Sequence, residues 1–285
     1  MKQILRIATL LCLVLGLGCG TALAADKKPV TLVYVEWPCA VATTNIVKVV
    51  IEEKLGHPCE ILPVSVAVKY QSLALGEADG TVCAWLPTTQ KTYWDKVKGD
   101  VEDLGPLVGG TRIGWVVPDY VPYTSIEQLK GHAAEFDGKI YGIDPGAEYM
   151  TTSENAIKEY GLDGFTLEEG SDAVMVAMLA DAIKRKKPVI VTGWAPHWKF
   201  GRWDLHFLDD PKGLFGGEEE IHTLVRKGLK EDMPDVYAFL DKFRFLDTKQ
   251  LQMEMAKNEE KGADPYETAK KFVAEHPDQV ESWLK

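Results

Sequence analysis

Cysteine is scarce in this sequence, and the chain lacks the cysteine and histidine spacings of zinc sites. Of the five cysteines in 285 residues, Cys39, Cys59 and Cys83 follow the N-terminal segment. An odd number leaves at least one thiol without a partner in the same chain. The chain also has no HExxH pattern, P-loop or nucleophile elbow. We therefore expect no metal, no cofactor and no enzymatic activity. An exported hydrolase that uses Cys39 or Cys83 is an alternative without a supporting motif.

Basic residues are also scarce, since 32 Lys and Arg stand against 43 Asp and Glu and the net charge is −11. Such a surface disfavours nucleic acid and anionic lipid, so we expect neither as a partner. Long apolar runs are missing after residue 25, so we expect no bilayer-spanning helix in the remaining chain. The sequence also has no internal repeat and no Pro/Gly/Ser-rich linker that would divide it into sequential domains.

Residues 1–25 predict a secretory signal peptide. Two basic residues precede an apolar run, which ends in a small-x-small cleavage site at 22–24. Cleavage there implies an exported, periplasmic protein. A lipid anchor at Cys19 is a rival interpretation, but Gly16 stands where a lipoprotein signal usually has Leu.

Short strand-like segments alternate with helical ones, which indicates an α/β fold. We expect two lobes joined by crossing strands, each lobe a mostly parallel sheet flanked by helices. The chain would cross between them near Ile113–Pro118 and Leu205–Leu208. Residues 26–115 and 206–285 would then form the first lobe, and 116–205 an inserted second lobe.

Three strand-like segments end in a tryptophan that is followed by proline within two residues. The segments are LVYVEWP, TVCAWLP and PVIVTGWAP, and their tryptophans are Trp37, Trp85 and Trp194. Ligands of α/β proteins gather at the carboxyl ends of strands. Aromatic faces attract cations, and a quaternary ammonium suits them best because it is weakly hydrated and has no N–H group to satisfy. The three indoles therefore predict a cation box.

The stretch YGIDPGAEYM predicts a strand, a Pro-Gly turn and a helix. Backbone N–H groups at such a junction suit a carboxylate or phosphate. The strand ends at Gly142 to Asp144 and the helix begins near Glu148, although Tyr149 is bulky for a position beside such a site. An anion site next to a cation box describes a site for a zwitterion.

At this point the sequence resembles a known family, through VEWPCAVATTN, AWLPTTQKTYW, GIDPGAEYM, KKPVIVTGWAPHW, FLDDPKGLFG and EEIHTLVRKG. It is similar to the glycine betaine/proline betaine-binding proteins of ABC importers, from about Val30 to Trp283. The resemblance implies a type II periplasmic-binding-protein fold. It also implies a trimethylammonium cage made of Trp37, Trp85 and Trp194.

The carboxylate-binding amides of the family match Gly142 and Ile143. Many relatives have His where this chain has Gln90, and that His helps to hold the carboxylate. Gln90 can still donate a hydrogen bond but carries no charge, so the sequence leaves the preferred betaine open.

The function that the resemblance implies is capture of an osmoprotectant and its delivery to a membrane permease with an ATPase. We expect the binding protein to be a monomer. A binding protein for choline or carnitine, or an osmolyte sensor module, remains an alternative. His197 is expected at a cleft edge or on the lobe surface. For Cys39 and Cys83 we expect buried free thiols, with a disulfide as the alternative.

Overall fold

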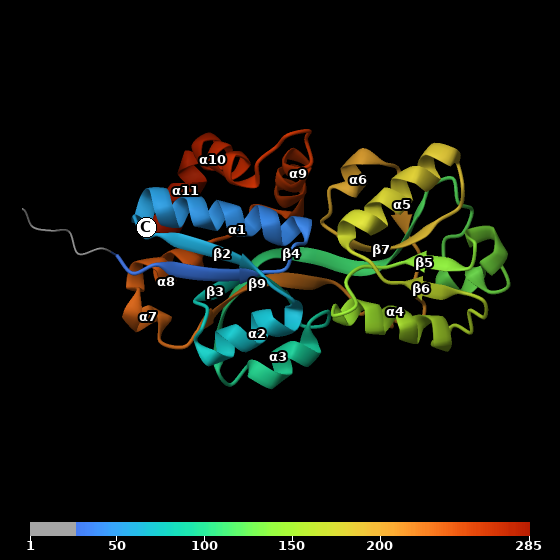
Figure 1. The fold of residues 1–285 in the computed structure, drawn as a ribbon, viewed down its shortest axis with the longest axis horizontal. Helices are drawn as coiled ribbons and strands as arrows, with labels where there is room; N and C mark the ends of the chain where they lie inside the picture. Colours follow the sequence, from blue (N-terminus) through green and yellow to red (C-terminus); the bar gives the residue numbers. More distant parts are fainter. Residues whose placement is uncertain (1–26) are drawn as a thin grey trace, which may run out of the picture.

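A computed structural model describes residues 27–285. The expected signal peptide and Cys19 lie outside these residues. Figure 1 shows two lobes side by side, with strand β4 running from one into the other. No helix of the described part of the chain combines the length and apolar character that a membrane span requires.

The first lobe contains the beginning and the end of the described chain. Its strands are β1 (Val30–Tyr34), β2 (Cys59–Pro63), β3 (Gly80–Leu86), β9 (Glu219–Arg226) and the first half of β4 (Val101–Pro118). Its helices are α1 (Pro38–Val50), the π-helical turn Ile51–Leu55, α2 (Val66–Leu75), α3 (Lys91–Val97), α7 (Leu229–Asp232), α8 (Pro234–Lys242), α9 (Thr248–Asn258), α10 (Pro265–Glu275) and α11 (Pro277–Leu284).

The second lobe lies between the two crossings of the chain. Its strands are the second half of β4, β5 (Lys139–Tyr141), β6 (Thr166–Glu168), β7 (Ile190–Ala195) and β8 (Leu205–Phe207). Its helices are α4 (Glu148–Glu159), α5 (Asp172–Arg185), α6 (Lys199–Arg202) and the 3-10 turns Ile126–Leu129 and Ala133–Phe136. In Figure 1, α4 lies on one side of the strands and α5 on the other.

The strands follow the order β2-β1-β3-β9-β4-β7-β5-β6, and β8 pairs with β4. Strand β4 changes partners along its length, because its pairs with β9 end at Thr111 and its pairs with β7 begin at Arg112. The β-α-β parts of each lobe pair in parallel, as β1 does with β2 and β3, and β5 with β6 and β7. The crossing strands add antiparallel pairs, so each sheet is mixed rather than mostly parallel.

Helix α1 begins at Pro38, because Trp37 is extended and Pro38 occupies the first turn of the helix. Proline suits that position, since its missing N–H would have no partner there. Helix α1 thus follows directly from the first of the three tryptophans.

Candidate functional site

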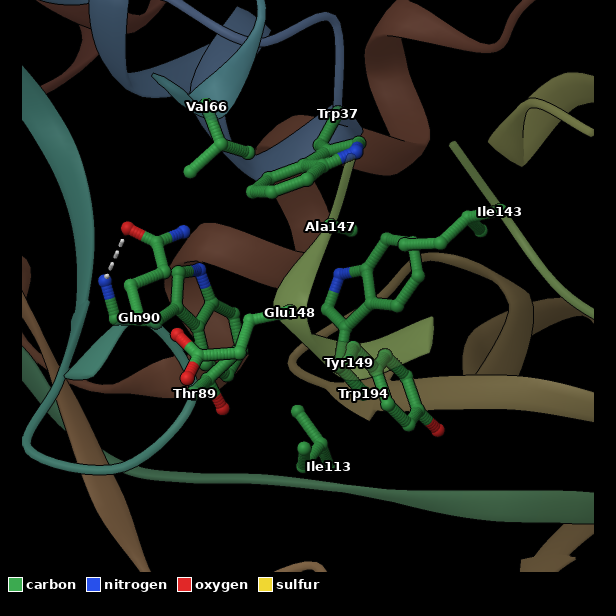
Figure 2. A pocket seen from close by; sticks show the side chains of 11 residues that line it. Trp37, Val66, Thr89, Gln90, Ile113, Ile143, Ala147, Glu148, Tyr149 and Trp194 are labelled. Carbon is green, nitrogen blue, oxygen red and sulfur yellow. Dashed lines mark hydrogen bonds between the residues drawn. The ribbon is translucent and has the colours of Figure 1, made fainter. Parts of the chain in front are cut away.

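A cavity lies between the lobes, where the strands of both sheets end. Figure 2 shows side chains from both lobes around the same space. Strand β3, the start of α2 and the residues before α1 and α3 contribute from the first lobe. Strands β4 and β7, the loop after β5 and the start of α4 contribute from the second. The lining residues are Trp37, Val66, Trp85, Thr89, Gln90, Ile113, Ile143, Ala147, Glu148, Tyr149 and Trp194.

The three predicted tryptophans all line this cavity. Trp37, Trp85 and Trp194 are 7%, 3% and 4% exposed, so their rings are almost completely removed from solvent. The Nε1 of Trp37 donates a hydrogen bond to Oδ2 of Asp144, in the opposite lobe, over 3.2 Å. The Nε1 of Trp194 has no hydrogen-bond partner within the described chain. The structure therefore brings together indoles that lie up to 157 residues apart in the sequence.

Gln90 lines the cavity with its amide group held in one orientation. Its Oε1 accepts hydrogen bonds from Nζ of Lys69 at 2.9 Å, the hydroxyl of Tyr70 at 2.8 Å and the backbone N–H of Trp85 at 3.3 Å. An ammonium and a backbone N–H can only donate, so the amide oxygen must face them. The Nε2 is left buried without a partner among residues 27–285. In Figure 2 it points from the amide toward the central space.

A buried carboxylate holds the turn that carries Gln90. Glu219, at the start of β9, is 2% exposed. It accepts hydrogen bonds from the N–H groups of Thr88 and Thr89 at 3.2 and 2.9 Å, and from the hydroxyl of Thr89. Nothing in the sequence around Glu219 indicates this role, because its partners lie 130 and 131 residues away in the chain.

The two expected backbone donors differ in their surroundings. The N–H of Gly142 donates to the carbonyl oxygen of Glu168 at 2.8 Å, and Gly142 does not line the cavity. The N–H of Ile143 donates to the thioether sulfur of Met150, a weak acceptor, and Ile143 does line the cavity. A Cβ at Gly142 would lie 2.5 Å from the end of the Met150 side chain, so a larger residue there would displace the thioether.

Tyr149 fills the floor of the cavity below these groups. It is buried, and its hydroxyl lies between β4 and β7, where it accepts from the N–H of Gly193 at 2.8 Å and donates to the carbonyl oxygen of Gly114 at 2.6 Å. Burial raises the pKa of this phenol well above its ordinary value. The large side chain of Tyr149 therefore joins β4 and β7 through its hydroxyl, at the floor of the cavity.

Hydrogen bonds close the cavity between the lobes. Glu148, at the start of α4, accepts from the backbone N–H of Thr92 at 3.0 Å and from its hydroxyl, both on α3. The hydroxyl of Tyr93 donates to the carbonyl oxygen of Gly146 at 2.8 Å. Together with the bond from Trp37 to Asp144, these contacts join the first lobe to the second. Glu148 also places a carboxylate on the cavity wall.

Two buried polar side chains support Trp194 from behind. The ring of His197 lies edge-on to it at 4.7 Å, and Nζ of Lys199 lies 4.8 Å from the ring centroid. Both side chains are fully buried, which corrects the expectation that His197 is a cleft-edge or surface residue. Its Nε2 lies 3.1 Å from Asp172. Burial lowers the pKa of His197 to about 4 and that of Lys199 to about 8.

Cys39 and Cys83 meet behind the cavity. Their Sγ atoms are 3.5 Å apart, and both side chains are buried free thiols, as expected. Neither sulfur lines the cavity. Within residues 27–285 no group of three or more His, Cys, Asp or Glu side chains could hold a metal ion.

These features define a class of protein: a two-lobed α/β binding protein with an aromatic cavity at the lobe interface. The comparison with known families agrees. Residues 28–275 match the family described as the substrate-binding domain of the ABC-type glycine betaine transport system. The chain belongs to this family. It is a family of binding proteins, not of enzymes, so the predicted family, fold class and non-enzymatic nature are confirmed.

Individual relatives support the assignment. The glycine betaine/carnitine transport binding protein GbuC of Listeria monocytogenes is 47% identical over 164 residues, which cover 57% of this chain. They cover 53% of that protein, so the chain spans about half the length of this relative. The ProX structure from Borrelia burgdorferi has 41% identity and a TM-score of 0.86, and the match covers 90% of this chain and 97% of that one. Lactococcal OpuAC in complex with glycine betaine has 41% identity and a TM-score of 0.85, with 91% and 100% covered.

Proposed function

We propose that the protein binds glycine betaine, proline betaine or a closely related quaternary ammonium zwitterion between its lobes. The observation that carries the proposal is the convergence of Trp37, Trp85 and Trp194 on one cavity from both lobes. A quaternary ammonium needs no hydrogen-bond acceptor and binds to aromatic faces. At about 0.5–2 kcal/mol for each ring, three indoles supply much of the affinity of a small ligand.

The carboxylate of the ligand would lie at the other end of the cavity. Gln90 supports this placement best, because its Nε2 is buried, unpartnered in the described chain and directed into the cavity. A buried donor without an acceptor costs about 1–3 kcal/mol, which a ligand carboxylate would recover. Ile143 would exchange its weak bond to Met150 for the carboxylate. The N–H of Gly142 would first have to break its hydrogen bond to Glu168, so we assign Gly142 a smaller share of the carboxylate binding.

Binding would proceed by closure of the two lobes. Trp37 and Trp85 would hold the ligand first, and closure would bring Trp194 and Ile143 onto it by a hinge motion. The change of partners in β4 between Thr111 and Arg112 supports a hinge close to the expected lobe boundary at residues 115 and 116. The assignment of residues 26–115 and 206–285 to the first lobe stays a prediction.

We also propose that the closed protein delivers its ligand to a membrane permease that works with an ATPase. The names of the relatives as transport binding proteins support such partners. The role would be uptake of osmoprotectants by a monomeric, periplasmic protein. An osmolyte sensor would need a receptor partner instead of a permease.

Isothermal titration calorimetry with a panel of ligands tests the proposed function. We expect glycine betaine or proline betaine to bind more tightly than choline, which has the same cationic group without the carboxylate. Carnitine tests whether the site also accepts a zwitterion that is longer than the betaines. Recovery of the intact ligand after incubation would exclude hydrolysis. Failure of every quaternary ammonium to bind would contradict the proposal.

A choline-binding or carnitine-binding protein is the second candidate. The observation that favours choline is the carboxylate of Glu148 on the cavity wall, which adds negative charge near the cage. Equal or tighter binding of choline in the same titration would favour this candidate. It would also show that Gln90, Ile143 and Gly142 do not form an anion site.

A further inference from the structure

A buried lysine lies directly behind the predicted carboxylate end of the cavity. Lys69, on α2, is 1% exposed. Its Nζ donates to Oε1 of Gln90 at 2.9 Å and to the carbonyl oxygen of Cys83 at 2.8 Å. Within residues 27–285 no carboxylate lies within salt-bridge distance of it, in contrast to Lys27 and Lys48, which each pair with a carboxylate. The structure thus buries an ammonium next to Gln90 without a counter-charge.

A charge in this position is costly unless something compensates for it. Burial of an ammonium costs several kcal/mol unless it is paired or well hydrogen-bonded. Lys69 has two carbonyl-type acceptors and the face of the Tyr70 ring at 4.9 Å, but these are neutral groups. A negatively charged ligand group on the far side of Gln90 would provide the missing counter-charge.

We propose that Lys69 is a positioning residue that supplies the positive charge of the carboxylate end of the cavity, acting through the amide of Gln90. The inference rests on the proposed function and deepens it, because it names the residue that makes the site prefer zwitterions over plain cations. Lys69 does not line the cavity, so it would not touch the ligand.

The hydrogen-bond geometry explains how the positive charge of Lys69 strengthens the interaction of Gln90 with a ligand carboxylate. The ammonium, the Tyr70 hydroxyl and the Trp85 N–H all donate to Oε1, which turns Nε2 toward the cavity. A cation on the oxygen draws electron density from the amide and makes its N–H bonds stronger donors. A positive charge one amide group away is also felt more strongly in this water-poor interior than it would be in water.

The pKa of Lys69 gives the inference a pH signature. Burial lowers this pKa to about 8, while the thiols of Cys83 and Cys39 act in the opposite direction. The ammonium is therefore present at neutral pH and lost as the pH rises through 8. A bound carboxylate favours the charged form, so betaine binding near pH 8 would take up a proton.

Other titratable groups lie near Lys69, and their effects on the pH dependence of binding have to be distinguished from that of Lys69. Cys83 has a lowered pKa, chiefly through its hydrogen bond with Cys39, whose pKa is raised by the same bond. Burial raises the pKa of Tyr70 well above its ordinary value, and Glu148, Asp103 and Glu219 add to that rise. The variant Cys83→Ala removes the titrating thiol closest to Lys69. It should keep the pH dependence of betaine binding.

The test compares glycine betaine with choline on Lys69→Met and on the wild type. We expect Lys69→Met to lose about tenfold or more in betaine affinity and to keep its choline affinity within about threefold. Tyr70→Phe is the matched control, because it removes a hydrogen bond to the same oxygen and leaves the charge. It should keep most of the preference for betaine.

Calorimetry of the wild type at about pH 7 and about pH 9.5 measures how the ligand affinities depend on pH. A purely structural role of Lys69 would not produce such a dependence. The ratio of betaine to choline affinity should fall with pH in the wild type and in Cys83→Ala, but not in Lys69→Met. Titrations in buffers with different ionisation enthalpies should show proton uptake near pH 8 with betaine only. Lys199 also titrates near pH 8, but it lies behind Trp194 and would affect both ligands.

Equal losses for both ligands in Lys69→Met, or an unchanged ratio, would overturn this inference and leave the proposed function intact. If Lys69→Met does not fold, a wild-type ratio that is independent of pH would overturn it instead. A wild type that binds neither ligand would overturn the proposed function, and this inference with it.

Discussion

Two kinds of side chain on the cavity wall carry the proposed ligand contacts. They are the indole rings, whose faces attract cations, and the neutral amide of Gln90, whose NH2 group has no partner in the described chain. Trp37 and Trp194 are fixed by groups that the ligand would not touch. Asp144 holds the indole nitrogen of Trp37, while His197 and Lys199 pack against Trp194. Rings that cannot turn lose little entropy on binding, so their interaction energy is available for the ligand.

The cage predicts a specific effect of removing one ring. Trp85→Ala should weaken binding of glycine betaine at least tenfold, which is about 1.4 kcal/mol, because one cation–π contact and its apolar surface are lost. Calorimetry measures the affinity, and circular dichroism checks the fold. The control is Trp203→Ala, a partly buried tryptophan outside the cavity, which should leave the affinity unchanged. A folded Trp85→Ala variant with wild-type affinity would refute the cage.

The amide predicts an effect on ligand preference. Gln90→Glu keeps the shape of the side chain but replaces the Nε2 donor with a carboxylate oxygen, which would repel the carboxylate of the ligand. We expect betaine affinity to fall by about tenfold or more, and choline affinity to stay the same or rise. Competition titrations of the two ligands measure the ratio. An unchanged ratio would remove Gln90 from the site.

At the residue scale, the sequence predicted the side chains that belong to a recurring local motif. It did not predict the side chains that act through partners far away in the chain. The Trp-Pro pattern led to all three indoles. Nothing local marks Glu219 or Lys69, because their roles depend on contacts with residues 14 or more positions away. His197 was placed wrongly because its neighbours in the sequence do not reveal its burial against Asp172.

At the scale of elements, the starts of α3 and α4 form a clasp between the lobes. The carboxylate of Glu148 accepts from the N–H of Thr92 in the first turn of α3, where backbone N–H groups have no partner within the helix. The clasp therefore favours the closed arrangement and should contribute to ligand retention.

Tyr93→Phe tests the clasp without changing the cavity wall. The variant removes the hydroxyl that bonds to Gly146 and keeps the ring, which stacks on Tyr70. Loss of one such bond costs about 0.5–1.5 kcal/mol, so we expect the dissociation constant to rise by about two- to tenfold, mainly through faster release. Stopped-flow fluorescence measures the release rate. Tyr120→Phe, which loses a bond to Lys187 inside one lobe, should release ligand at the wild-type rate; equal effects of both variants would contradict the clasp.

Helices α1, α2, α4 and α5 and the parallel strands could be predicted from the sequence, but α3 and the first half of β4 could not. The stretch VEDLGPLVGG contains Gly105, Pro106, Gly109 and Gly110, which normally indicate turns. In the structure this stretch pairs with β9, with register shifts between Asp103 and Thr111. Bulges accept glycine and proline within a strand, and they depend on the partner strand rather than on the local sequence.

At the scale of the whole molecule, the chain leaves the first lobe along β4 and returns along β9. The sequence predicted the two lobes from repeated β-α-β patterns. It could not predict that both crossing strands pair antiparallel with their neighbours, because strand direction depends on where the chain returns and not on the composition of the strand.

The buried imidazole behind Trp194 predicts how global stability depends on pH. Its pKa is lowered to about 4 from an ordinary 6.5, so the unfolded chain binds a proton before the folded chain does. The stability that neutral His197 provides is fully present above pH 6.5 and is lost as the pH falls from 6.5 to 4. The total loss is about 3 kcal/mol. Urea unfolding at several pH values measures it.

The variant His197→Gln should lack this part of the pH dependence. Its stability deficit relative to the wild type should therefore shrink as the pH falls from 6.5 to 4, because other groups titrate equally in both proteins. Parallel stability curves for the two proteins over this range would contradict the burial of a neutral imidazole.

A crystal structure of the protein with glycine betaine tests the proposed binding site most directly. We expect the trimethylammonium group between the rings of Trp37, Trp85 and Trp194, with a carboxylate oxygen within hydrogen-bond distance of Nε2 of Gln90. A ligand found outside the cavity, or one whose ammonium group touches none of these three rings, would contradict it.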